Sequence, residues 1–235
     1  MASVIIGYSA CQLTREAFER QGHDVWTCDL LPPRGASDKH LQMDVWDALA
    51  LRKWDAGVFH PMCTFLNVAS VWALKDPDFA RYPGKGYHQR VKPGTLTGAA
   101  RRAAQREAFE NFQRLLDLDI LLGIENPAPS TLNRNVCPPS QVIHPYMFGD
   151  DASKGTGLWM KGLPPLVVPP QGEWVNPRIV TTATGKQAKR WANQTDSGQN
   201  RLGPSASRWL ERSATFPGIA AAMGDQWGRY LNQVL

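Results

Sequence analysis

Blocks of apolar residues at the start of the chain predict a β-α-β unit. Residues 4–7 and 24–29 each form a short apolar run typical of a strand, and residues 12–21 between them place Leu13, Ala17 and Phe18 on one face of a helix. Gly22 is a typical helix end. This order is that of the first unit of a doubly wound sheet, in which ligands bind beyond the carboxyl ends of the strands.

The middle of the chain continues the alternation of strands and helices. A short strand is predicted at residues 43–45, and longer ones at 56–59 and 120–124. Residues 98–118 predict a helix with Phe109, Phe112, Leu115 and Leu116 facing inward and Arg101, Arg102 and Arg106 facing outward. Residues 74–97, rich in proline and glycine, lack any period, and a long loop of this kind is usually functional.

The last third of the chain predicts a different end to the sheet. Residues 141–146 and 157–161 read as a pair of strands separated by the polar turn at 149–151. Residues 163–195 show no period, whereas 217–231 form a helix with Ile219, Met223, Trp227 and Leu231 as a core stripe. We therefore expect an α/β fold: one domain over 1–235, a mostly parallel doubly wound sheet with a terminal antiparallel hairpin, and an irregular basic insertion over 163–213.

Composition narrows the class of protein. The 235 residues are 43% hydrophobic and 20% charged, as in ordinary globular proteins, and no apolar run approaches the roughly 20 residues of a membrane-spanning helix. The start carries no basic leader, so we expect a cytoplasmic protein without a membrane partner. Four widely spaced cysteines predict neither a metal site nor disulfides. The net charge of +5 favours a polyanionic partner.

Two reactive side chains follow predicted strands. Cys63 lies just beyond the strand at 56–59, and Glu125 follows the strand at 120–124. A thiolate adds readily to an electron-poor carbon, and a neighbouring carboxylic acid can protonate the ring nitrogen that receives the charge. The pair indicates chemistry at a pyrimidine ring. Taken alone, a cysteine and a glutamate favour a structural interpretation, in which Cys63 is a small buried residue and Glu125 caps a turn. Asp29, at the end of the second strand, either holds a ribose hydroxyl or caps a turn.

The order of these segments resembles the cytosine carbon-5 DNA methyltransferases, especially the short phage-type or prophage-type members. The resemblance runs through the turn at residues 7–10, Asp29, Asp44, the segment at 61–63 and Glu125 with Asn126. It continues through residues 141–149, 154–165 and 212–228. It implies a class I methyltransferase-like (Rossmann-like) sheet, S-adenosylmethionine as cofactor and DNA as substrate, in a bacterial or phage-infected host cytoplasm.

The resemblance also implies roles for individual residues. Cys63 would add to carbon 6 of cytosine while Glu125 protonates ring nitrogen 3, and Asn126 would brace the loop that carries Cys63. The residues expected to hold S-adenosylmethionine are Gly7, Tyr8, Ser9, Asp29, Leu30, Asp44, Val45 and Pro61. Those expected to contact nucleic acid are Arg81, Lys85, Arg90, Arg101, Arg102, Lys154, Arg201 and Arg208.

The chain departs from the family pattern at two points and is shorter than its larger members. Met62 separates Pro61 from Cys63, and Ala10 with Cys11 replaces the glycine-rich part of the first turn. A large target-recognition domain has no room, so short loops would carry any sequence specificity. Duplex DNA with a flipped base and single-stranded DNA both remain open as substrates, and so does the oligomeric state. Two alternatives are a pyrimidine carbon-5 modifier that acts on nucleotides or uses another one-carbon donor, and a catalytically silent protein that binds nucleic acid.

Overall fold

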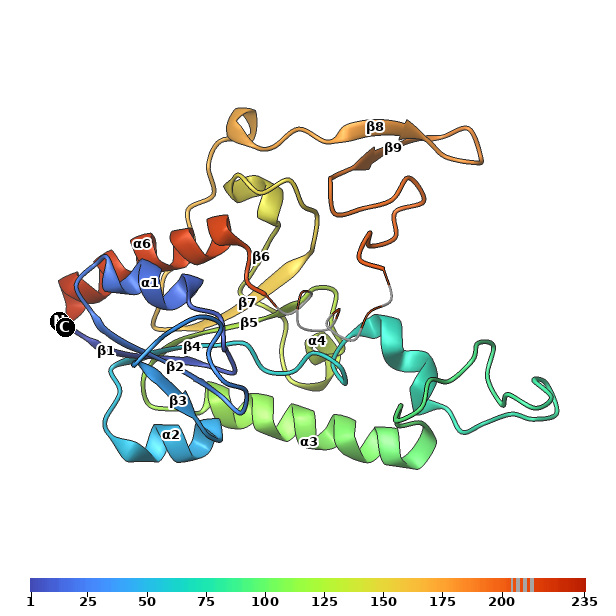
Figure 1. Ribbon diagram of the computed structural model, residues 1–235, viewed down its shortest axis with the longest axis horizontal. Helices are drawn as coiled ribbons and strands as arrows, with labels where there is room; N and C mark the ends of the chain where they lie inside the picture. Colours follow the sequence, from blue (N-terminus) through green and yellow to red (C-terminus); the bar gives the residue numbers. More distant parts are fainter. Residues whose placement is uncertain (204, 206–207, 209–210, 212–213) are drawn as a thin grey trace.

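A seven-stranded sheet forms the centre of the computed structural model, which describes residues 1–203, 205, 208, 211 and 214–235 (Figure 1). The strand order is β3-β2-β1-β4-β5-β7-β6. The bounds are β1 (Ser3–Gly7), β2 (Asp24–Asp29), β3 (His40–Gln42), β4 (Ala56–Phe59), β5 (Leu121–Pro127), β6 (Gln141–Ile143) and β7 (Thr156–Lys161). Strands β1 to β5 are parallel, and β7 runs antiparallel to both neighbours. The predicted α/β, Rossmann-like fold with a terminal antiparallel pair is confirmed.

Helices cover both faces of the sheet (Figure 1). On one face lie α1 (Leu13–Glu19) and α6 (Pro217–Val234), and on the other α2 (Val45–Leu51) and α3 (Gly98–Leu116). A short α4 (Leu132–Asn135) and the 3-10 helices η1 (Val68–Leu74), η2 (Pro145–Phe148) and η3 (Gln171–Glu173) lie in the connections. Each face has its own apolar core, one around Trp227 and the other around Phe59 and Trp159.

The two helices of the first face touch at backbone level. The closest approach is at Gly224 of α6, where a Cβ atom would lie 2.5 Å from the carbonyl carbon and 2.8 Å from the Cα of Ala17 in α1. Real Cβ atoms do not approach backbone so closely, so a side chain at this position forces the helices apart. Glycine at 224 therefore sets the spacing between α1 and α6.

This contact leads to a stability prediction. Gly224→Val is expected to destabilise the protein by about 1–3 kcal/mol, because overpacking moves two helices away from the sheet. Gly172→Ala is the control, since a Cβ at Gly172 meets no atom within 4 Å. Urea unfolding of both variants measures the effect, and equal midpoints would contradict it.

Most predicted elements are confirmed, with two corrections in the first half of the chain. Residues 43–45 do not form a strand: the strand lies just before them, at His40–Gln42, and Asp44 caps the unpredicted helix α2 by accepting a hydrogen bond of 2.8 Å from the Trp46 backbone N–H. Leu13 was expected in the core but is 37% exposed, and Thr14 takes the buried position in α1.

The carboxyl-terminal part contains one confirmed stripe and one unpredicted hairpin. The stripe of Ile219, Met223, Trp227 and Leu231 is buried as predicted. Residues 163–195 were expected to be irregular, but β8 (Arg178–Thr181) and β9 (Gln187–Arg190) pair in antiparallel fashion. The ring of Trp191, just after β9, stacks on Tyr146 of η2 at 4.3 Å, which anchors the hairpin. Of the predicted insertion, residues 204, 206–207, 209–210 and 212–213 lie outside the described part.

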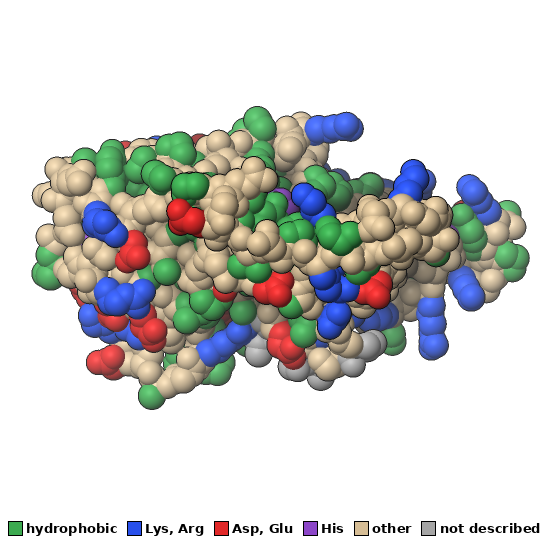
Figure 2. Space-filling model, turned by 90° about the horizontal axis from the view of Figure 1, so that it is seen from above, with side chains coloured by type: hydrophobic (Ala, Val, Ile, Leu, Met, Phe, Trp, Pro, Cys, Tyr) green, Lys and Arg blue, Asp and Glu red, His purple; other side chains and the backbone are tan. Residues whose placement is uncertain are grey.

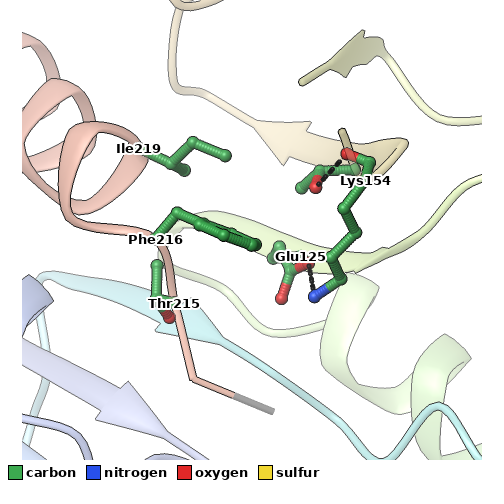
Figure 3. A pocket seen from close by; sticks show the side chains of 6 residues that line it. Glu125, Lys154, Thr215, Phe216 and Ile219 are labelled. Atoms are coloured by element: carbon green, nitrogen blue, oxygen red, sulfur yellow. Dashed lines mark hydrogen bonds and ion pairs between the residues drawn. The ribbon is translucent and has the colours of Figure 1, made fainter. Parts of the chain in front are cut away.

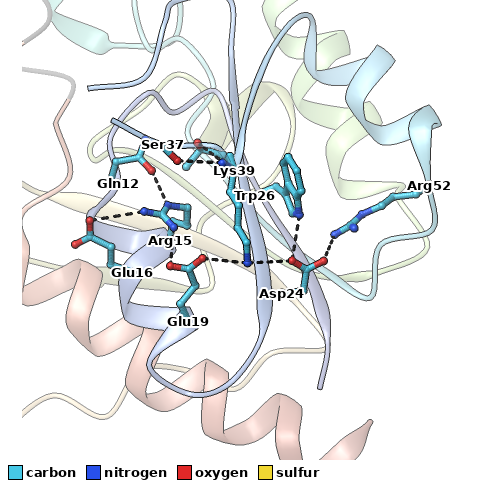
Figure 4. Close-up of polar contacts among 10 residues, drawn as sticks. Gln12, Arg15, Glu16, Glu19, Asp24, Trp26, Ser37, Lys39 and Arg52 are labelled. Atoms are coloured by element: carbon cyan, nitrogen blue, oxygen red, sulfur yellow. Dashed lines mark hydrogen bonds and ion pairs between the residues drawn. The ribbon is translucent and has the colours of Figure 1, made fainter. Parts of the chain in front are cut away.

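Ion pairs join the edge of the sheet to its surroundings (Figure 4). Asp24 of β2 accepts hydrogen bonds from Arg52 at 2.7 Å and from Lys39 at 3.3 Å. Burial opposes ionisation of Asp24, but these two cations outweigh it and lower its pKa. Lys39 also pairs with Glu19 of α1 at 3.4 Å. These ion pairs link α1, β2 and the segments on either side of them, so we infer that they stabilise the fold.

The described residues contain neither a membrane-spanning helix nor a cluster of metal-binding side chains. Across the described residues, no helix combines the length and apolar character needed to cross a bilayer. The same residues contain no group of three or more His, Cys, Asp or Glu side chains placed to hold a metal ion.

Candidate functional site

Cys63 lies on the loop that leaves β4 at the carboxyl edge of the parallel sheet. The loop folds into a tight turn, because the Cys63 carbonyl accepts hydrogen bonds of 3.0 Å from the backbone N–H groups of both Leu66 and Asn67. The Cys63 side chain is half-buried, whereas the neighbouring Met62 is 65% exposed. Met62 therefore points outward and does not fill the space beside the thiol.

Glu125 lies within β5, the strand next to β4. Phe59 pairs with Ile124 across these parallel strands, so the following residues, His60 and Glu125, reach the same edge of the sheet. His60 Nδ1 lies 3.1 Å from Glu125 Oε2, and Lys154 Nζ lies 3.8 Å from Glu125 Oε1. Sequence reasoning placed Lys154 at nucleic acid and did not pair either residue with Glu125.

The basic side chains around Glu125 influence its charge. Burial of the carboxyl group opposes ionisation, but Lys154 and the hydrogen bond from His60 outweigh it and lower the pKa of Glu125 to about 2. The carboxyl group is therefore ionised at neutral pH, with both oxygens facing nitrogen atoms. An ionised carboxylate at this position can accept a hydrogen bond from a polar ligand.

The low pKa also predicts how stability depends on pH. Because the pKa of Glu125 is lower in the folded chain than its ordinary value of 4.5, its ionisation stabilises the fold above about pH 4.5, and this contribution is lost as the pH falls toward 2. The difference in unfolding free energy between wild type and Glu125→Gln should therefore be larger at pH 7 than at pH 3. Urea unfolding at the two pH values measures it, and a difference that grows on acidification would contradict the ion-pair account.

Asn126 braces the loop that carries Cys63. Its side chain is 1% exposed, and Nδ2 donates a hydrogen bond of 2.9 Å to the carbonyl of Pro61. Further along the same loop, the Leu66 carbonyl accepts hydrogen bonds from Ser130 Oγ at 3.0 Å and from the Thr131 backbone N–H at 2.9 Å. The segment that follows Glu125 thus holds the Cys63 loop at both ends, in agreement with the bracing contact expected of Asn126.

Helix α3 holds the same loop from the other side, which corrects one prediction. Arg101 was expected to face outward and contact nucleic acid, but it is only 4% exposed. Its guanidinium donates a hydrogen bond of 2.5 Å to the Thr64 carbonyl and lies 4.8 Å above the Phe65 ring. Gln105, one turn later, donates to the Phe65 carbonyl at 2.8 Å. A buried guanidinium occupied in this way serves to position the Cys63 loop.

A small pocket opens beside Glu125 (Figure 3). It is lined by Glu125, Lys154, Thr156, Thr215, Phe216 and Ile219. The start of α6 supplies an apolar wall, and the ring centroid of Phe216 lies 6.0 Å from Lys154 Nζ. An apolar ring therefore lies on one side of the pocket and a charged pair on the other. Sequence reasoning missed Phe216, because its only signal was its position before the predicted helix.

The residues expected to hold the cofactor lie at the carboxyl ends of β1, β2 and β4 and after β3, although several are engaged in packing. A Cβ at Gly7 would meet the Phe59 ring at 2.5 Å, so packing alone requires glycine there. Tyr8 adopts a φ of 57° and donates a hydrogen bond of 3.0 Å to Asn111 of α3, and burial raises its pKa to about 12. Val45 is 3% exposed. The side chains of Tyr8 and Val45 therefore serve the fold.

Asp29 and Leu30 fit a nucleoside better. Asp29 is half-buried at the end of β2, where Oδ1 accepts a hydrogen bond of 2.9 Å from the Leu31 backbone N–H, and Leu30 beside it is 69% exposed. A carboxylate next to an exposed apolar side chain matches a ribose hydroxyl next to a base. Ser9 is buried, with its backbone N–H bonded to the Cys28 carbonyl at 2.9 Å, and the exposed Asp44 caps α2. Pro61 is buried beneath the Cys63 loop.

The remaining basic residues expected at nucleic acid are more accessible. Arg81, Lys85 and Arg90 are exposed on the long loop between η1 and α3, which extends away from the sheet (Figure 1). Arg102 is held by the Leu74 carbonyl at 2.7 Å and by Asp76 at 3.1 Å. Arg201 donates to the Gln194 carbonyl at 3.0 Å and stays exposed, and Arg208 is partly exposed. Figure 2 shows Lys and Arg side chains along the projecting end of one face, with a few acidic ones among them.

Comparison with known proteins adds no assignment to this geometry. No model of a protein family matches the chain. A search among curated proteins finds no match either.

Proposed function

We propose that the chain is an S-adenosylmethionine-dependent methyltransferase that acts on carbon 5 of cytosine in DNA. One observation carries the proposal: a thiol on the β4 loop and a carboxylate in β5 lie at the same edge of the sheet, and Asn126 ties the two segments together with a hydrogen bond of 2.9 Å to Pro61. This arrangement supports attack on a flat ring by the thiol while the carboxylate contacts the ring edge.

The chemistry assigns one task to each residue. The Cys63 thiolate adds to carbon 6, which makes carbon 5 nucleophilic, and Glu125 manages the proton on ring nitrogen 3. Carbon 5 takes up the methyl group and then loses its proton. The electron pair left on carbon 5 re-forms the double bond to carbon 6 and breaks the carbon 6–sulfur bond, which releases Cys63 and restores the aromatic ring. Asn126 and Arg101 hold the thiol in position throughout, because both grip the backbone of its loop.

The cofactor proposal rests on the carboxyl edge of β1 and β2. S-adenosylmethionine would supply an electrophilic methyl group. Asp29 would accept hydrogen bonds from the ribose, and the exposed Leu30 would pack against the adenine. The turn after β1 is stabilised by the rest of the chain, because Ala10 is buried and its carbonyl accepts a hydrogen bond of 2.9 Å from the Arg34 backbone N–H.

DNA as the substrate is supported by charge. The net charge is +5, and the exposed Arg81, Lys85 and Arg90 project on a loop that begins beyond the Cys63 turn. Cations placed in this way bind phosphates and release counterions. A cytosine within a duplex would be flipped out of the stack to reach the site, and single-stranded DNA avoids that cost.

The test is group transfer. Wild type is incubated with isotopically labelled S-adenosylmethionine and either duplex or single-stranded DNA, and the digested nucleosides are analysed by mass spectrometry. Labelled 5-methyldeoxycytidine is expected. Modification of free cytosine nucleotides without any modification of DNA would support the nucleotide alternative instead. No modification of either substrate, together with salt-dependent DNA binding, would support a catalytically silent binding protein.

A further inference from the structure

His60 is a buried histidine with one nitrogen engaged and one unexplained. Its side chain is 7% exposed, and Nδ1 lies 3.1 Å from Glu125 Oε2. The other ring nitrogen, Nε2, is buried and finds no hydrogen-bond partner within the described part of the chain. Among the described residues, Nδ1 is therefore the ring nitrogen placed to exchange a proton with Glu125.

The backbone fixes this histidine in place. The His60 N–H donates a hydrogen bond of 3.0 Å to the Gly7 carbonyl at the end of β1, on the opposite side of β4 from Glu125. The backbone of His60 is therefore bonded to β1 on one side of β4, while its side chain contacts Glu125 of β5 on the other. Of the two basic side chains beside Glu125, His60 lies closer, at 3.1 Å from Oε2, whereas Lys154 lies 3.8 Å from Oε1.

We propose that His60 stores the proton for the reaction, passing it through Glu125 to the substrate ring and taking it back when the product forms. This role rests on the proposed pyrimidine chemistry. It answers a requirement of that chemistry, since Glu125 is a carboxylate before substrate binds, and a carboxylate has no proton to give. His60 acts through Glu125, so it is a positioning and relay residue.

The transfers balance at each step. When the Cys63 sulfur bonds to carbon 6, the electron pair of the carbon 5–carbon 6 double bond shifts toward carbon 4, and the pair of the carbon 4–nitrogen 3 bond shifts to nitrogen 3. The Nδ1 proton of His60 moves to Glu125, and Glu125 passes this same proton to nitrogen 3. Glu125 thus ends as a carboxylate, and the histidine ring changes from imidazolium to neutral. After methyl transfer, the carbon 5 proton leaves to water, the carbon–sulfur bond breaks, and the nitrogen 3 proton returns by the same route.

A first experiment reads the proton directly and needs no activity. Histidine labelled with nitrogen-15 reports by NMR whether the His60 ring is imidazolium or neutral, with the signal assigned by its loss in His60→Asn. At pH 7, wild type is expected to show the imidazolium form and Glu125→Gln the neutral form, because an amide does not stabilise the cation. The same ring state in both proteins would overturn the proposal, whether or not the chain proves to be a methyltransferase.

A second experiment measures the consequence for turnover. In His60→Asn the amide can still donate to Glu125 but cannot ionise, so kcat is expected to fall by about 100-fold or more at pH 7, and the alkaline limb of the wild-type pH–rate profile should disappear. His144→Asn is the matched control, since His144 also has a buried ring nitrogen without a partner among the described residues but stacks on Tyr146 at 5.0 Å. An unchanged rate and pH profile in His60→Asn would overturn the relay.

The two experiments distinguish a failure of the proposed methyltransferase function from a failure of the proposed role of His60. If wild type transfers no methyl group to DNA, the proposed function fails, and the NMR comparison still decides whether His60 and Glu125 share a proton. If wild type is active and His60→Asn is slow only because it unfolds, the urea midpoint of His60→Asn will be lower than that of wild type. The NMR spectrum of Glu125→Gln then decides whether the ring state of His60 depends on Glu125.

Discussion

Cys63→Ser is expected to lose methyl transfer to cytosine by at least roughly three orders of magnitude while keeping the fold. The serine hydroxyl stays protonated at neutral pH and is a far weaker nucleophile than a thiolate. The half-buried side chain at 63 tolerates the isosteric change, because the contacts that hold its loop come from the backbone: the Cys63 carbonyl and the carbonyls of Pro61 and Thr64. Transfer of a labelled methyl group to DNA measures the loss.

Cys137→Ser provides the matched control. Cys137 is also half-buried, and burial raises the pKa of its thiol, so it stays protonated and unreactive. This variant should retain the wild-type rate. Equal activity of Cys63→Ser and wild type would remove the nucleophile from the proposed mechanism.

Glu125→Gln is expected to cause the second large loss of methyl-transfer activity. The substitution removes the charge that faces Lys154 and His60 and the group that handles the nitrogen 3 proton, so kcat should fall by about 10²–10⁴-fold. DNA affinity should change little, because the exposed cations of the long loop are untouched. Glu107→Gln, an exposed position on α3, is the control and should leave the rate as in wild type.

A Glu125→Gln variant with weakened DNA binding and normal turnover of the bound substrate would contradict the catalytic role of Glu125. It would mean that Glu125 orders the surroundings of the DNA and takes no part in the proton transfer. Measuring kcat at saturating DNA separately from the DNA dissociation constant distinguishes these cases.

Local patterns were sufficient for most of the sheet. The apolar runs in β1, β4 and the first part of β5 are buried on both faces, so each is a continuous hydrophobic block. In β2 the buried Val25 and Cys28 flank the half-buried Trp26 and the buried Thr27. The stripe on α6 likewise follows from its spacing. The order of these elements was enough to expect that Cys63 and Glu125 reach one edge, because parallel neighbours place their carboxyl ends together.

Elements without an apolar pattern were harder to predict. The hairpin of β8 and β9 exposes one face and only half-buries the other. The apolar Ile179 lies on the exposed face, at 58% exposure, so residue type does not follow burial there. The position of the hairpin depends on the stacking of Trp191 on Tyr146, residues far apart in the sequence. Helix α2 is short, and its cap, Asp44, was interpreted as part of a strand.

The site itself contains pairings that no local rule predicts. Arg101 has the sequence context of a surface cation on an amphipathic helix, yet it is buried because the Thr64 carbonyl and the Phe65 ring offer it a hydrogen bond and a π face. His60 and Glu125 are 65 positions apart in the sequence. Their contact could be predicted only from the exact residue pairing between β4 and β5. The residue types at the site could be predicted, and their pairing could not.

Covalent trapping tests the central claim most directly. DNA containing 5-fluorocytosine is incubated with the protein and S-adenosylmethionine, and the products are separated under denaturing conditions. Because fluorine cannot leave carbon 5 as a proton does, wild type is expected to form a stable protein–DNA adduct, and peptide mass spectrometry should place the DNA on Cys63. Cys137→Ser should form the same adduct and Cys63→Ser none. Labelled methyl transfer to ordinary DNA by wild type without any adduct on the fluorinated DNA, or an adduct on another residue, would contradict addition by Cys63.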